Sequence, residues 1–126
     1  MPRTASRPEL LSPSEWRVFW IVSRRHPLTI AEIGRELARH EPDEAPLNDN
    51  TVRTFVKRLQ SKGYLTVETS SGRDLLSYRP SVPYEIALRF HVNRFLDQFA
   101  LSGRADLEAL RALIEERLGT SVTGSA

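Results

Sequence analysis

Residues 50–65 read NTVRTFVKRLQSKGYL, and this stretch decides the fold of the 126-residue chain. Its apolar side chains recur at helical spacing and fall on one face of a predicted helix. They are Val52, Phe55, Val56 and Leu59. Gly63 predicts the end of this helix, because glycine adopts the left-handed conformation of a helix C-terminus at little cost. The opposite face carries short polar side chains and cations, with no acid between Thr51 and Val67.

Two shorter helices are predicted before this one. The first begins at Ser12, which forms a capping box with Glu15, while Pro13 takes the first helical position. The second begins at Thr29, which forms the same box with Glu32. The side chains expected on the buried faces are Trp16, Phe19, Trp20 and Ser23 in the first helix and Ile30, Ile33 and Leu37 in the second.

A β-hairpin is predicted after the third helix. The runs LTVETS (65–70) and RDLLSYR (73–79) are rich in strand-forming residues and flank a Ser71-Gly72 turn. Leu28 leaves room for one short strand between the first two helices. Three helices followed by a hairpin predict a winged helix-turn-helix domain over residues 11–80, after a mobile tail at residues 1–10. We expect Trp20, Ile33 and Phe55 to form the three-helix core.

Two more amphipathic helices are predicted after Pro80, so the expected fold class is mainly α with a small β-hairpin wing. The first opens with Pro83 and Glu85, and the second runs from about Arg104 to Leu118. Their apolar stripe consists of Leu88, Val92, Phe95, Phe99, Leu107, Leu110 and Ile114. A second copy of the chain is the simplest partner that could bury this stripe, so residues 81–118 are predicted to be the dimerisation region of a homodimer. Residues 119–126 are small and polar and are predicted to be a disordered tail.

Composition excludes several classes of function. The chain has no cysteine, which excludes disulfides, thiolate metal sites and cysteine nucleophiles. No apolar run approaches the length of a membrane span, and no signal peptide is recognisable, so we expect a cytoplasmic protein without a membrane partner. His26, His40 and His91 are isolated from one another, and no nucleophile–base pair or glycine-rich phosphate loop appears. We therefore expect no metal, no cofactor and no enzymatic activity.

Double-stranded DNA is the expected partner, because short polar groups near the start of the third helix suit base edges and cations around them suit phosphates. The candidate DNA-binding residues are Asn50, Thr51, Arg53, Thr54, Lys57, Arg58, Lys62 and, in the hairpin turn, Arg73. The net charge is only +2, so the basic face could also be an ordinary solvated face. Two other functions stay open: a winged-helix protein–protein interaction module, and a MarR-like or PadR-like regulator that senses a small molecule.

Three segments carry a resemblance to a known family: LSPSEWRVFWIV (11–22), LTIAEIGREL (28–37) and NTVRTFVKRLQSKGYL (50–65). They resemble the penicillinase-repressor family of BlaI, MecI and CopY relatives, and the TVRT…KRL…KGYL pattern is the specific part. The resemblance implies a dimeric repressor that binds an inverted-repeat operator built around TACA and TGTA. It places Thr51, Arg53 and Thr54 at the DNA, with Asn50 just before them, and Lys57 and Arg58 at the family's basic positions.

The chain departs from this family in two ways. Members released by proteolysis carry an Asn-Phe bond in the dimer region, and this sequence has no Asn-Phe bond. Copper-responsive members bind metal through C-terminal cysteines, which are also missing. Release by a β-lactam-sensing protease or by copper is therefore not expected, and an unknown effector or another protease stays open.

Overall fold

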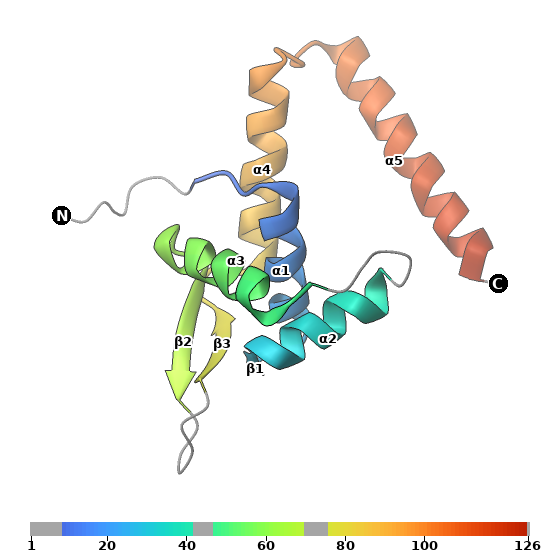
Figure 1. Cartoon of the computed structure of the whole chain (residues 1–126). Helices are drawn as coiled ribbons and strands as arrows, with labels where there is room; N and C mark the ends of the chain where they lie inside the picture. Colours follow the sequence, from blue (N-terminus) through green and yellow to red (C-terminus); the bar gives the residue numbers. More distant parts are fainter. Residues whose placement is uncertain (1–8, 42–46, 70–75, 126) are drawn as a thin grey trace. The chain divides into compact units, whose positions relative to one another are not determined.

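The structure is a computed structural model that describes residues 9–41, 47–69 and 76–125. Its elements in chain order are α1 (Pro13–Arg24), β1 (Leu28–Thr29), α2 (Ile30–His40), α3 (Asp49–Ser61), β2 (Leu65–Thr69), β3 (Leu76–Pro80), α4 (Tyr84–Gln98) and α5 (Arg104–Ser125) (Figure 1). They form two compact units, Met1–Leu88 and Arg89–Ala126. Three helices followed by two paired strands make the first unit a winged helix-turn-helix, which confirms the predicted fold class.

The starts of α1 and α2 are formed by the side chains that the sequence indicated. Ser12 Oγ accepts a hydrogen bond from the Glu15 N–H at 3.2 Å, and Glu15 Oε1 accepts one from the Ser12 N–H at 2.9 Å. Thr29 and Glu32 form the same reciprocal pair at the start of α2. Asn48 is the cap of α3, where its Oδ1 accepts from a backbone N–H at 2.9 Å. These bonds satisfy N–H groups that have no partner inside the helix.

The sheet is small and antiparallel, with the strand order β1-β3-β2. Tyr78 in the central strand β3 pairs with Leu28 on one side and with Val67 on the other. The pairing of β2 with β3 confirms the predicted hairpin. The predicted Ser71-Gly72 turn between them lies outside the described residues.

The core of the first unit lies where the three helices meet the base of the sheet. Its largest fully buried side chains are Tyr64, Phe19, Ile33, Leu59, Val18, Val22, Val52 and Val56. The ring of Phe19 packs edge-on against that of Tyr64, with centroids 5.3 Å apart. The expectation that Ile33 lies in the core is confirmed.

The predicted core was wrong in its other two members, because Trp20 and Phe55 are only partly buried at its edge. The indole of Trp20 packs edge-on against His40, and the Arg24 guanidinium lies 4.7 Å from its ring centre. This position suits an amphipathic indole, since its apolar side contacts the core while its polar side stays near water. The buried apolar side chains of α1 are therefore Val18, Phe19, Ile21 and Val22. The buried face of α1 is thus rotated about the helix axis relative to the predicted stripe.

The start of α4 belongs to the first unit. The Tyr84 ring lies 5.4 Å from the Trp16 ring and 6.1 Å from the Phe19 ring, and Ala87 is buried. The compact unit therefore extends to Leu88, beyond the boundary predicted after Pro80.

The second unit contains the rest of α4 and the helix α5. Between them Ala100 has a left-handed backbone with φ of 55°, and the Leu101 N–H donates to the Leu96 carbonyl at 2.8 Å. The helix α5 begins at Arg104 as predicted but continues to Ser125, where a disordered tail was predicted after Leu118. A helix that has already formed gains one hydrogen bond for each residue added, so weak helix formers can extend it. In the described residues, no helix has the length and apolarity needed to cross a bilayer.

Candidate nucleic-acid interface

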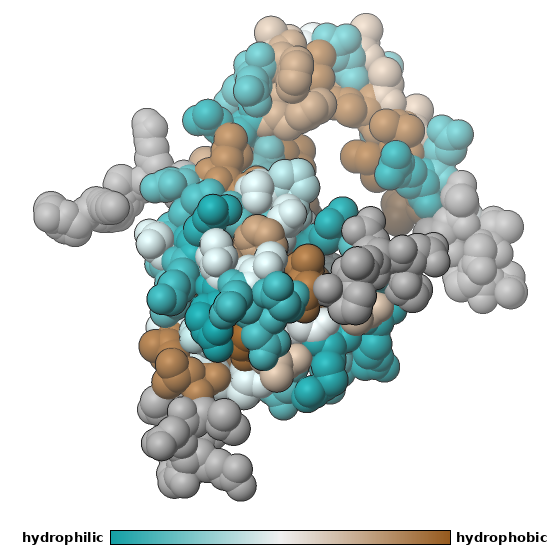
Figure 2. Space-filling view, in the orientation of Figure 1, coloured by the Kyte–Doolittle hydropathy of each residue, from teal (hydrophilic) through white to brown (hydrophobic). Residues whose placement is uncertain are grey.

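The helix α3 presents one face to the core and the opposite face to solvent. Val52, Val56 and Leu59 are each at most 1% exposed and fix the rotation of the helix. The exposed side chains on the opposite face are Asn50, Arg53, Thr54, Lys57, Arg58 and Ser61. Hydrophilic side chains, drawn in teal, also dominate the front of this unit, where α2 and α3 lie (Figure 2). The rotation predicted for this helix is therefore confirmed, although Phe55 is less buried than its neighbours.

The first half of the exposed face is held by two hydrogen bonds. The Arg53 guanidinium donates from Nη1 to Asn50 Oδ1 at 3.2 Å, and Thr54 Oγ1 donates to the Asn50 carbonyl at 3.0 Å. Because the Thr54 proton is used within the helix, its hydroxyl can act only as an acceptor toward a ligand. Asn50 keeps its amide donors, and Arg53 keeps further donors in its planar fork.

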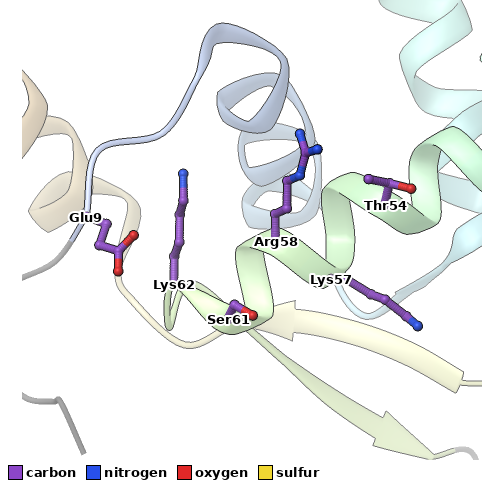
Figure 3. Close-up of a pocket in the computed structure, with 6 residues that line it drawn as sticks. All are labelled: Glu9, Thr54, Lys57, Arg58, Ser61 and Lys62. Atoms are coloured by element: carbon purple, nitrogen blue, oxygen red, sulfur yellow. The ribbon is translucent and has the colours of Figure 1, made fainter.

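The second half of the face forms one side of a groove of about 500 Å³. Figure 3 shows the residues that line it: Glu9, Thr54, Lys57, Arg58, Ser61 and Lys62. Lys57 and Arg58 are exposed, so their charges are accessible from solvent. Glu9 is the acid among these residues and comes from the segment that precedes α1.

Lys62 differs from the other predicted cations because its charge is used inside the protein. Its Nζ donates to Glu15 Oε1 at 2.8 Å and to the Leu10 carbonyl at 3.0 Å, so the ammonium turns away from Lys57 (Figure 3). Burial raises the pKa of Glu15, but the hydrogen bonds from Lys62 and Ser12 outweigh it and hold that pKa below its ordinary value. In this structure the Lys62 ammonium neutralises a carboxylate that is only 4% exposed, and its role as a phosphate ligand stays a prediction.

The predicted site residue Thr51 is not among the exposed side chains of this face. Thr51 is partly buried, and its backbone N–H donates to the helix cap Asn48. Arg73 lies outside the described residues. Among the described residues, no three histidine, aspartate or glutamate side chains are close enough together to hold a metal ion.

The sequence did not identify Glu9 and Tyr64 as part of this region. The buried Tyr64 hydroxyl donates to the Glu9 carbonyl, which fixes the segment before α1 across the end of α3. Burial and the nearby Glu9 carboxylate raise the pKa of Tyr64 to about 12, so the phenol keeps its donor proton at neutral pH. The contact joins residues 55 positions apart, so local spacing in the sequence carries no signal for it.

Several solved structures share the fold of this chain. RosR from H. salinarum gives a TM-score of 0.55 at 14% identity, covering 87% of this chain and 96% of that chain. FabT from Streptococcus pneumoniae in complex with DNA gives a TM-score of 0.52 at 15% identity, covering 92% of this chain and 78% of that chain. A MarR/EmrR family transcriptional regulator from an Acinetobacter species gives a TM-score of 0.50 at 19% identity, covering 90% of this chain and 78% of that chain. At these identities the likeness shows the fold alone.

The family itself follows from the sequence comparison. None of the curated proteins matches the chain. The family model described as penicillinase repressor matches residues 11–121, which include the winged unit and nearly all of the two C-terminal helices. The chain therefore belongs to the penicillinase repressor family of DNA-binding transcriptional regulators.

Proposed function

We propose that this regulator is a homodimeric repressor that places the α3 helix of each chain in the major groove of an inverted-repeat operator. The observation that carries the proposal is the exposed face of α3. This helix, which the structure describes throughout, bears no carboxylate on the face that runs from Asn50 to Ser61. A basic and polar helix face with the opposite face buried has the form of a recognition helix.

The first half of α3 suits recognition of bases. The amide of Asn50 can pair with adenine through N6 and N7, and the fork of Arg53 can pair with guanine through O6 and N7. Thr54, whose proton is held by the Asn50 carbonyl, can offer its methyl group to a thymine methyl. These chemistries fit half-sites of the TACA and TGTA type, which the family resemblance implies.

The second half of α3 suits the phosphate backbone. Lys57 and Arg58 line the groove together with the Ser61 hydroxyl, one helical turn or more beyond the base-reading residues. A cation at this distance neutralises phosphate and gives affinity without sequence preference.

The apolar side chains of α4 and α5 support the homodimer. Figure 2 shows apolar side chains, drawn in brown, along both helices. Phe99 is 60% exposed and Ile114 is 56% exposed, and Leu110 is the partly buried member of the predicted stripe. The exposed members of that stripe are Leu88, Val92, Phe95, Phe99, Leu107 and Ile114. Covering about five such side chains in each chain contributes on the order of 10 kcal/mol before the entropy of association is subtracted.

A binding titration tests the proposal. One duplex carries TACA and TGTA half-sites as an inverted repeat, a second carries the same bases in scrambled order, and both are titrated at several salt concentrations. The proposal predicts tighter binding to the first duplex and a linear fall of log affinity with log salt on both. A wild-type protein with no salt dependence on either duplex would contradict it and favour a protein–protein interaction module.

Two variants separate base reading from phosphate binding. Arg53→Ala should weaken binding to the half-site duplex by about 1–3 kcal/mol and affect the scrambled duplex much less. Arg58→Ala is the matched control, because it removes the same charge from the same helix and should weaken both duplexes alike. Equal losses of affinity on the two duplexes for Arg53→Ala would show that Arg53 binds phosphate. Base recognition would then depend on Asn50 and Thr54.

A further inference from the structure

A carboxylate lies at the edge of the half of α3 that is proposed to bind phosphates. The groove beside this half is lined by Lys57, Arg58 and Ser61 of α3 and also by Glu9, which comes from the segment before α1 (Figure 3). Glu9 is exposed, as are Lys57 and Arg58. A ligand that enters the groove therefore meets charges of both signs.

The main chain of Glu9 is attached to the end of α3. The Tyr64 hydroxyl donates to the Glu9 carbonyl, and Lys62 Nζ donates to the carbonyl of the next residue, Leu10, at 3.0 Å. Tyr64 is 1% exposed, and Lys62 Nζ also donates to Glu15 Oε1 at 2.8 Å, so the fold holds both donors in place. The backbone that carries the Glu9 carboxylate is thus fixed at two consecutive residues.

The cations that line the groove do not neutralise this acid. In the described part of the chain, no ion pair joins Glu9 to Lys57 or Arg58. Lys62, the third cation of the lining, pairs with Glu15. A phosphate that Lys57 and Arg58 attract into the groove would share it with the negative charge of Glu9, and a like charge at this distance weakens binding.

We propose that Glu9 is a negative determinant of DNA affinity, whose carboxylate repels the backbone phosphate that Lys57 and Arg58 attract. This inference rests on the proposed function and adds an opposing charge to the phosphate-binding half of α3. Phosphate contacts carry no sequence information, so an acid that limits them keeps binding dependent on the base contacts of the first half of the helix. Tyr64 is a positioning residue in this proposal, because it holds the main chain of Glu9 beside the groove.

A charge series at one position tests the proposal in the full-length chain. Glu9→Gln removes the charge, and Glu9→Lys reverses it. Affinity should rise from wild type to Glu9→Gln and again to Glu9→Lys, and it should do so alike on the half-site and scrambled duplexes. A unit charge about 6 Å from a phosphate in water changes a binding constant by about threefold, so each step should give about threefold for each chain bound. The gain should shrink as salt is added, because screening shortens the range of the repulsion.

The matched control makes the same charge changes in the other unit. Glu116 is exposed on α5, and Glu116→Gln and Glu116→Lys should change affinity much less than the variants of Glu9 do. Equal gains at the two positions would overturn the inference, because they would reflect total charge alone. A gain on the half-site duplex only would also overturn it, because Glu9 would then act on base recognition and not on phosphate.

Two further outcomes separate this inference from the proposed function. Unchanged affinity for both Glu9 variants, with normal salt-dependent binding of the wild-type chain, would overturn the inference and leave the proposed function intact. A wild-type chain that shows no salt-dependent binding to any duplex would contradict the proposed function itself.

The positioning role of Tyr64 is tested by coupling. Tyr64→Phe removes the donor to the Glu9 carbonyl and keeps the buried ring. It should raise affinity in the wild-type chain, because the carboxylate is held less firmly beside the groove, and it should have no further effect in the Glu9→Gln chain. A purely structural role would change affinity equally in both backgrounds, and this result would contradict the positioning role.

Discussion

At the residue scale, α3 and α4 end in the same hydrogen-bond pattern with different residues in the left-handed position. After α3 the Tyr64 N–H donates to the Leu59 carbonyl at 2.8 Å, and Gly63 between them has φ of 86°. After α4 the left-handed residue is Ala100, with φ of 55°. An L-residue pays about 1–2 kcal/mol for this conformation, whereas glycine adopts it freely.

Exchanging the two residue types should therefore change stability in opposite directions. Gly63→Ala should destabilise the first unit by about 1 kcal/mol, and it should do so through the backbone alone, since a Cβ there would meet no atom within 4 Å. Ala100→Gly should stabilise the second unit by about 0.5–1 kcal/mol. Urea denaturation followed by far-UV circular dichroism measures both changes. Changes of the same sign would contradict the argument.

The ion pair of Lys62 and Glu15 predicts a pH-dependent stability. The pKa of Glu15 lies below its ordinary value, so the pair contributes stability at pH values above that ordinary value, and the contribution is lost as pH falls through the lowered pKa. Lys62→Met leaves the buried carboxylate without the ammonium that pairs with it. It should lower the free energy of unfolding by about 1–3 kcal/mol near neutral pH. The cost should fall toward zero once Glu15 is protonated.

Denaturation of Lys62→Met and of Lys57→Met at neutral and at acid pH checks this prediction. Lys57 lies exposed on the same helix, so its replacement controls for the loss of one positive charge. A Lys62→Met cost that does not change with pH would show that packing of the lysine stem, and not the carboxylate, is responsible.

At the scale of elements, the way that each helix packs decides which aromatic residues stabilise the first unit. Phe19 on α1 is fully buried and touches the rings of Tyr64 and Tyr84. Phe55 on α3 lies at the edge of the core. Phe19→Ala should therefore lower the free energy of unfolding by about 3–5 kcal/mol, and Phe55→Ala should lower it by less than half as much. Thermal unfolding of both variants provides the comparison, and equal costs would contradict the observed rotation of α3.

Those features of the elements that depend on neighbouring residues could be predicted from the sequence. The capping boxes at Ser12 and Thr29, the helix end at Gly63 and the exposed face of α3 all follow from spacings of a few residues. The position of Trp20 could not, because it depends on where His40 and the other helices lie. The pairing of Lys62 with Glu15 joins residues 47 positions apart, and local spacing carries no signal for it.

At the scale of the whole molecule, the apolar stripe of α4 and α5 should determine the oligomeric state. Phe95→Glu places a charge within this stripe and should produce monomers, because an unpaired carboxylate cannot be buried in an apolar interface. Gln98→Glu adds the same charge at an exposed position of the same helix and serves as control. Loss of the dimer should also weaken binding to the inverted-repeat duplex by more than about tenfold, since the two half-sites are no longer bound together.

Analytical ultracentrifugation at micromolar concentration measures this effect. The wild-type chain and Gln98→Glu should sediment as dimers, and Phe95→Glu as a species of 14.4 kDa. A wild-type chain that sediments only as the 14.4 kDa species would refute the homodimer.

The contact between Trp16 and Tyr84 has an optical consequence. Both tryptophans lie on α1 and every tyrosine precedes residue 89, so the second unit contains no fluorophore that absorbs at long ultraviolet wavelengths. Intrinsic emission therefore reports on the winged unit and on the first turn of α4 alone, whereas far-ultraviolet ellipticity reports on the helices of both units. If α5 and the part of α4 that follows Leu88 lose structure first, ellipticity will fall while the emission of Trp16 beside Tyr84 stays constant. The unmodified chain thus carries a built-in spectroscopic distinction between its two units.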